Sequence, residues 1–134
     1  MFEKLVEKLT AAGLDAREVE IFAGQYYDGA DHGEFFHVVR VEMDFSVPFS
    51  RLDSIVKRRG LVYDCRPCWG CGVRIYTIWR ADDREKARRL ENVARAFLDA
   101  FWVAIHADPA ARLDDAAGAI AAGRAAVAAL EMEG

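Results

Sequence analysis

Three cysteines within seven residues are the part of this sequence whose residue types and spacing point most directly to chemistry. Cys65, Cys68 and Cys71 are the only cysteines of the chain, and the last two have the spacing Cys-x-x-Cys-Gly. This spacing is typical of a metal-binding knuckle, in which backbone N–H groups turn toward two thiolates, and Cys65 could supply a third sulfur. Because tetrahedral zinc needs four ligands, one of the three histidines or a second chain must complete the site. An iron–sulfur cluster would also lack its usual fourth cysteine.

Two other interpretations of the cysteines compete with zinc. In one, Cys65 and Cys71 face each other across a hairpin as small buried residues, with Cys68 at the tip. In the other, Cys68 is a reactive thiol whose thiolate is favoured by the neighbouring Arg66. Thiol–disulfide enzymes usually place the reactive thiol at a helix N-terminus, whereas this motif lies in a turn between strands. The odd number of cysteines favours free thiols or metal ligands over a disulfide framework.

Aromatic and arginine side chains form a second candidate site. In the expected strands they alternate so that aromatic rings lie between guanidinium groups on one face of a sheet. Such a face can stack nucleic-acid bases and contact phosphates. It can equally anchor a protein partner, because tyrosine and arginine are enriched at interfaces, or the C-terminal helix can cover it as core. The predicted partner-binding residues are Tyr26, Phe36, Arg40, Arg74, Tyr76 and Arg80.

The usual signatures of an enzyme do not occur in the sequence. No serine stands on a nucleophile elbow, and no glycine-rich loop precedes a helix with phosphate-binding spacing. His37 lies in phase with the apolar residues of its strand, where a single histidine is more often a hydrogen-bonded core residue than a catalytic base. We therefore assign no catalytic residue and expect a protein without enzymatic activity.

Hydrophobic periodicity predicts the elements that position these residues. Apolar residues recur at helical spacing over residues 2–9, 49–56 and 87–105, the last helix spanning about 83–106. They alternate with polar residues over 18–27, 35–45 and the two halves of 61–80. The resulting order is α-ββα-ββα-α. The simplest fold that buries these patterns is α+β, with a four-stranded antiparallel sheet and helices packed on it.

An alanine-rich helix is expected after Asp108 and Pro109. Its apolar and small residues recur every seven positions, which lets it approach another helix closely, either in the same chain or in a second copy. We therefore divide the chain into an α+β core domain, residues 1–108, and a C-terminal helix, residues 109–134, that docks on the core or on a partner, including a homodimer. The recurring residues are Leu113, Ala116, Ile120, Gly123, Val127 and Leu130.

Composition and charge are those of a globular protein with an uneven charge distribution. The chain has 134 residues, of which 53% are hydrophobic and 30% charged, enough for one core. No apolar run approaches the ~20 residues that span a bilayer, and the N-terminus lacks the apolar core of a signal peptide, so we expect a cytoplasmic protein without membrane contact. The net charge is −6 over residues 1–50, +6 over 51–95 and −4 over 96–134.

These features predict a small, non-enzymatic binding protein that docks on a protein partner, of the inhibitor, immunity-protein or anti-defence type; the class is an analogy of size and acidity. An alternative is a nucleic-acid-binding module that uses the basic residues 51–95 and the arginine–aromatic face. A third is a metal-binding or redox protein that acts through Cys65, Cys68 and Cys71, with zinc as cofactor. The acidic total favours the protein partner.

Overall fold

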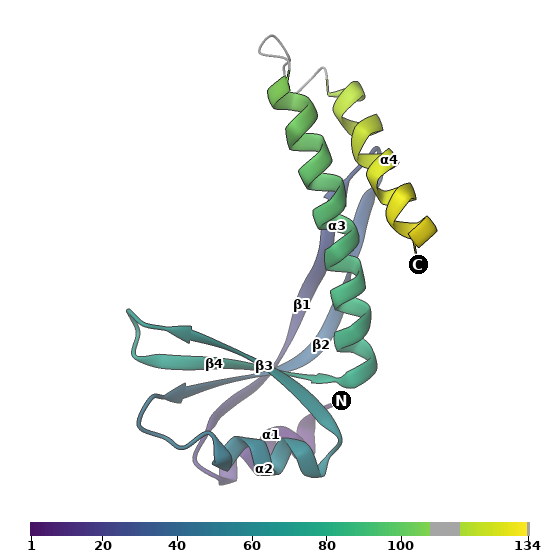
Figure 1. The fold of residues 1–134 in the computed structure, drawn as a ribbon. Helices are drawn as coiled ribbons and strands as arrows, with labels where there is room; N and C mark the ends of the chain where they lie inside the picture. Colours follow the sequence, from purple (N-terminus) through teal and green to yellow (C-terminus); the bar gives the residue numbers. More distant parts are fainter. Residues whose placement is uncertain (108–115, 134) are drawn as a thin grey trace. The chain divides into compact units, whose positions relative to one another are not determined.

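The computed structural model describes residues 1–107 and 116–133, and these residues form an α+β fold with one four-stranded antiparallel sheet and four helices (Figure 1). The order of elements is the predicted one. In the sheet the strands lie in the order β1-β2-β4-β3, so that β2 and β4 are central. The predicted fold class is therefore confirmed.

The element bounds differ from the predicted ones mainly at the strand and helix starts. The helices are α1 (Glu3–Ala11), α2 (Ser50–Arg58), α3 (Ala81–Ala107) and α4 (Ala117–Glu133). The strands are β1 (Asp15–Tyr27), β2 (Asp31–Asp44), β3 (Leu61–Cys68) and β4 (Val73–Arg80). The helix α3 follows β4 without a loop, and Asp82 lies in its first turn. A negative charge there favours the helix.

The chain forms two compact units, and each contains parts of several elements. The first unit comprises residues 1–21 and 35–85, and the second comprises residues 22–34 together with the described residues from 86 onward. The predicted domain boundary at residue 108 lies outside the described residues. The division between the units instead crosses the β1–β2 hairpin and the start of α3.

The core of the first unit lies between the sheet and the helices α1 and α2, which lie side by side on one of its faces (Figure 1). Val39, Val41 and Met43 of β2 are almost completely buried there, with Leu9 of α1 and Leu52 of α2. Burial of each such side chain stabilises the fold by about 1.5–3 kcal/mol. This packing stabilises α1. The charged residues four apart in that helix, Glu3 with Glu7 and Lys4 with Lys8, repel each other and do not stabilise it.

The register between β2 and β4 determines which side chains share this core. Val39 pairs with Ile78 and Val41 with Tyr76, and side chains of directly opposed residues point to the same face. Tyr76 and Ile78 are therefore buried against α1 and α2. Arg40 pairs with Thr77 and lies on the other face of the sheet.

The second unit is organised around Phe97 of α3, whose ring is buried. The ring of Tyr26, near the end of β1, lies 4.7 Å from that of Phe97, centroid to centroid. In α4, a Cβ added to Gly123 would stand 2.5 Å from the Phe97 ring. The close helix approach predicted from the small residues is thus confirmed, with α3 of the same chain as the neighbour (Figure 1).

Candidate functional site

The turn between β3 and β4 carries the cysteine motif and is closed in two ways. Cys68, the last residue of β3, pairs with Val73 and forms a disulfide with Cys71. The backbone N–H groups of Cys71 and Gly72 also donate hydrogen bonds to the Cys68 carbonyl, over 3.2 and 3.0 Å. Gly72 has a φ of +70°, a conformation that favours glycine. The sequence between the strands is therefore held in one compact turn.

The three cysteines do not form one cluster of thiols, because two of them are bonded to each other and the third lies apart from them. Cys65 pairs with Tyr76 rather than facing Cys71, and it is an exposed free thiol on the face of the strand opposite to Cys68. The expectation that disfavoured a disulfide is wrong for Cys68 and Cys71. A tight turn between neighbouring strands places their Cα atoms 5.3 Å apart, well within bonding range.

The zinc prediction lacks a ligand set in the described part of the chain. Within residues 1–107 and 116–133, no group of three or more histidine, cysteine, aspartate or glutamate side chains is placed to hold a metal ion. The two sulfurs with knuckle spacing are bonded to each other, and a disulfide offers no thiolate to zinc. Zinc would thus require reduction of Cys68 and Cys71 first.

The same turn presents an aromatic pair to solvent. Trp69, between the two bonded cysteines, is 81% exposed, and its ring lies 5.3 Å from that of Phe45, centroid to centroid. Phe45 follows β2 directly, and its N–H donates to the Gly72 carbonyl over 3.3 Å, which fixes it beside the turn. The sequence prediction did not include these two residues, although a tryptophan inside a Cys-x-x-Cys turn was a usable signal.

The predicted partner-binding residues do not share one sheet face, so that part of the prediction is wrong. Arg40 lies on one face, whereas Arg74, Tyr76 and Arg80 lie on the face covered by α1 and α2. The reason is the register, which places Tyr76 opposite Val41. The side chains of Tyr76 and Phe36 are also buried, with 3% and 5% exposure.

In the first unit these residues make internal contacts. Phe36 packs on Trp79, with ring centroids 5.8 Å apart. Arg74 donates a hydrogen bond to the Val47 carbonyl over 2.5 Å. Burial is the largest cause that raises the pKa of Tyr76, and a hydrogen bond with the Cys65 thiol raises it further. We conclude that most of the predicted site residues of this unit stabilise it.

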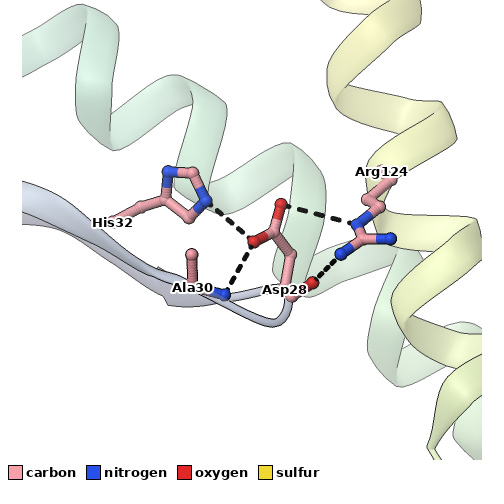
Figure 2. Close-up of polar contacts among 4 residues, drawn as sticks. All are labelled: Asp28, Ala30, His32 and Arg124. Atoms are coloured by element: carbon pink, nitrogen blue, oxygen red, sulfur yellow. Dashed lines mark hydrogen bonds and ion pairs between the residues drawn. The ribbon is translucent and has the colours of Figure 1, made fainter.

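Tyr26, the remaining predicted site residue, lies in the second unit, beside a polar cluster at the β1–β2 turn. Its ring stacks on that of His32 at 4.2 Å. The Asp28 carboxylate accepts hydrogen bonds from His32 Nε2, over 2.8 Å, and from the Ala30 N–H. Arg124 of α4 contacts the same carboxylate at 3.6 Å and donates to the Asp28 carbonyl (Figure 2). The cluster ties the turn to α4.

His32 and Asp28 are hydrogen-bonded as the histidine and aspartate of a catalytic triad are. The described cluster, however, contains no nucleophile as third member. The hydrogen bond from His32 is the largest cause that holds the pKa of Asp28 below its ordinary value. An ionised Asp28 is the form that Arg124 and His32 both favour. We therefore interpret the cluster as a structural contact.

His37 is a surface residue, contrary to the sequence prediction. Its side chain is 47% exposed, and its Nε2 lies 3.2 Å from a carboxylate oxygen of Glu20. At this end of β2 the neighbouring residues Phe36 and Val38 are buried, whereas Phe35 is exposed. The buried face changes along the strand, so a single alternation pattern assigned His37 to the wrong side.

A pocket of about 420 Å³ lies at the other end of the β3–β4 hairpin, in the first unit. Three basic side chains line it, together with buried and half-buried apolar side chains. The lining includes Phe2, Lys4, Leu5, Arg59, Leu61 and Arg80.

No helix within residues 1–107 and 116–133 combines the length and apolar character that crossing a membrane requires. Comparison of the chain with known proteins finds no matching family model, no matching curated protein and no matching solved structure.

Proposed function

We propose that this chain is a binding protein that docks on a protein partner through the turn between β3 and β4, with Trp69 as the central anchor. The observation that carries the proposal is the 81% exposure of Trp69 in a closed turn. A tryptophan has a large apolar surface, and tryptophan is among the residue types that dominate binding energy at protein interfaces.

The turn is organised before binding, which lowers the entropic cost of association. The disulfide, the two hydrogen bonds to the Cys68 carbonyl and the contact with Phe45 each restrict Trp69. The adjoining strand β4 is paired on both sides, with β2 and β3. Binding by such a turn immobilises few additional groups, so more of the contact energy appears as affinity.

The chemistry of the turn indicates the kind of protein surface that it fits. Trp69 and Phe45 suit an apolar pocket, and Arg66 is exposed next to Pro67 on β3. The chain between residues 51 and 95 has a net charge of +6, so acidic groups around the partner's pocket would speed association. A turn that inserts into a cleft is also compatible with the inhibitor-type function expected from the sequence.

Site-specific photo-crosslinking tests the location of the interface. The photoreactive amino acid p-benzoylphenylalanine would replace Phe45, which leaves Trp69 in place, and in a control variant it would replace Met132, which is 89% exposed on α4. We expect a crosslinked protein in extracts of the native host from position 45 and not from position 132. Excess unlabelled wild-type protein should abolish the crosslink, whereas excess Trp69→Ala should not. Equal crosslinking from both positions, or equal competition by both proteins, would contradict the proposal.

A further inference from the structure

The pocket at the open end of the β3–β4 hairpin contains cations that lack acidic partners. Lys4 comes from α1, Arg59 follows α2, and Arg80 ends β4. None of the three forms an ion pair with any residue that the structure describes. Glu3 is the one acidic residue in the lining. The pocket therefore has a net positive charge.

Contacts within the first unit position both guanidinium groups. The Arg80 guanidinium lies 5.5 Å from the centroid of the Phe2 ring, a cation–π distance. Arg59 donates a hydrogen bond to the Ile55 carbonyl over 3.2 Å, which holds its side chain against the end of α2. Each contact leaves other N–H donors of the guanidinium groups available, since each group has five.

The pocket also has an apolar wall. Phe2 and Leu5 are buried members of the core, and Leu61, which pairs with Arg80 across the hairpin, is half-buried beside them. Small-molecule sites are usually clefts of roughly 300–1,000 Å³ with apolar walls and a few convergent polar groups. A pocket of about 420 Å³ with this lining has the size and character of such a site.

We infer that this pocket binds a small ligand in which an oxyanion, either phosphate or carboxylate, is attached to an apolar group. The guanidinium fork matches the oxygen geometry of both anions, and Arg59 and Arg80 would hold the anion together with Lys4. The apolar group would lie against Phe2 and Leu61. This site reassigns Arg80 from a protein interface to a ligand pocket.

The inferred site is independent of the proposed docking turn. Leu61 and Arg80 are the first and last residues of the two strands, and the Cys68–Val73 pair is at the other end of the hairpin. Seven residue steps at about 3.3 Å each place the two ends about 23 Å apart. Trp69→Ala should therefore leave ligand binding unchanged, which separates failure of one proposal from failure of the other.

Titration of ¹⁵N-labelled protein with phenyl phosphate, followed by amide chemical shifts, tests the inference. We expect saturable shifts at residues 2–5, 59–61 and 80. Inorganic phosphate and phenol, which each carry half of the ligand's chemistry, should bind at least 10-fold more weakly. Benzoate in a parallel titration distinguishes a carboxylate ligand from a phosphate ligand by the tighter of the two dissociation constants.

Variants at adjacent arginines provide the matched control. Arg59→Ala and Arg80→Ala should each weaken binding at least 10-fold, and Arg58→Ala, which removes a neighbouring exposed charge outside the pocket, should change it less than 2-fold. Arg80→Gln replaces Arg80→Ala if the latter unfolds. The inference is overturned if no saturable shift appears with 10 mM phenyl phosphate or benzoate, or if Arg58→Ala weakens binding as much as the pocket variants.

Discussion

At residue scale, Gly123 controls how closely α4 approaches α3. A Cβ added there would stand 2.5 Å from the Phe97 ring, whereas a Cβ added at Gly118 in the same helix would meet nothing within 4 Å. We predict that Gly123→Ala lowers the free energy of unfolding by about 1–3 kcal/mol, because overpacking forces the helices apart. Gly118→Ala should be neutral or slightly stabilising. Urea denaturation measures both, and equal effects of the two substitutions would contradict the close approach.

Tyr63 and Asp53 give a prediction about pH. The Tyr63 hydroxyl donates a hydrogen bond to Asp53 over 2.9 Å, and this bond is the largest cause that lowers the pKa of Asp53 from its ordinary 3.8. A lowered pKa in the folded state stabilises the protein above pH 3.8, and this stabilisation is lost as the pH falls through the folded-state pKa.

Tyr63→Phe should therefore raise the pKa of Asp53 and make unfolding less dependent on pH between about 5 and 2. Titration of the carboxyl carbon by NMR measures the pKa directly. Tyr27→Phe is the control, since Tyr27 is 58% exposed. An unchanged Asp53 pKa in the Tyr63 variant would show that the hydrogen bond does not form in solution.

Local signals in the sequence predicted some of these residues and not others. A glycine directly after a helical pattern is a local signal for a left-handed cap, and Gly13 and Gly60 have φ values of +84° and +66°. Such caps depend only on neighbouring residues. The contact between Asp28 and Arg124 joins residues 96 positions apart, and neither residue carries a local signal for the other.

At the scale of elements, the strands were predictable but the faces of the β3–β4 hairpin were not. The alternation within each strand leaves open which residues of β3 and β4 share a face, and in the structure Tyr63 pairs with Ile78. Both faces of β4 carry buried apolar residues, Ile78 on one and Trp79 on the other. Alternation alone therefore did not determine which side chains of β3 and β4 lie on the same face of the sheet. The length of the cysteine turn determines this, because it sets the register of the hairpin.

The disulfide in this turn gives a prediction about the effect of removing it by substitution. Cys71→Ser should lower the free energy of unfolding by no more than about 2 kcal/mol, because a disulfide that closes so short a loop restricts the unfolded chain less than one that closes a long loop. Affinity for the crosslinked partner should fall about 3- to 10-fold, because the freed turn loses conformational entropy on binding. Calorimetric titration measures the change, with Cys65→Ser as the control. Unchanged affinity of Cys71→Ser would show that the disulfide does not organise the interface.

At the scale of the whole molecule, the basic middle of the chain raises the question of nucleic acid. Its arginines are partly engaged, since Arg84 contacts Asp64 at 2.6 Å and Arg74 donates to the Val47 carbonyl. Tyr76, the expected stacking residue, is buried. We predict no saturable binding of fluorescent DNA or RNA even at 50 mM salt. Saturable binding that weakens steeply with salt would instead support a nucleic-acid function.

The fold class was predictable as a whole, and the division into units was not. Periodicity and glycine caps yield the order of elements, and an antiparallel sheet is then the simplest way to bury them. The units, however, divide within the β1–β2 hairpin and near the start of α3, where no linker composition marks a boundary. Domain prediction from sequence relies on linkers. The domain boundary was therefore predicted at Asp108 and Pro109 instead.

The affinity of the purified partner for Trp69→Ala tests the central claim most directly. If Trp69 is the anchor, calorimetric titration should show binding at least 30-fold weaker than for wild type, a loss of about 2 kcal/mol that is typical of a central interface tryptophan. Met132→Ala, at an exposed site on α4, should bind within 2-fold of wild type. Wild-type affinity of a folded Trp69→Ala variant would contradict docking through this turn.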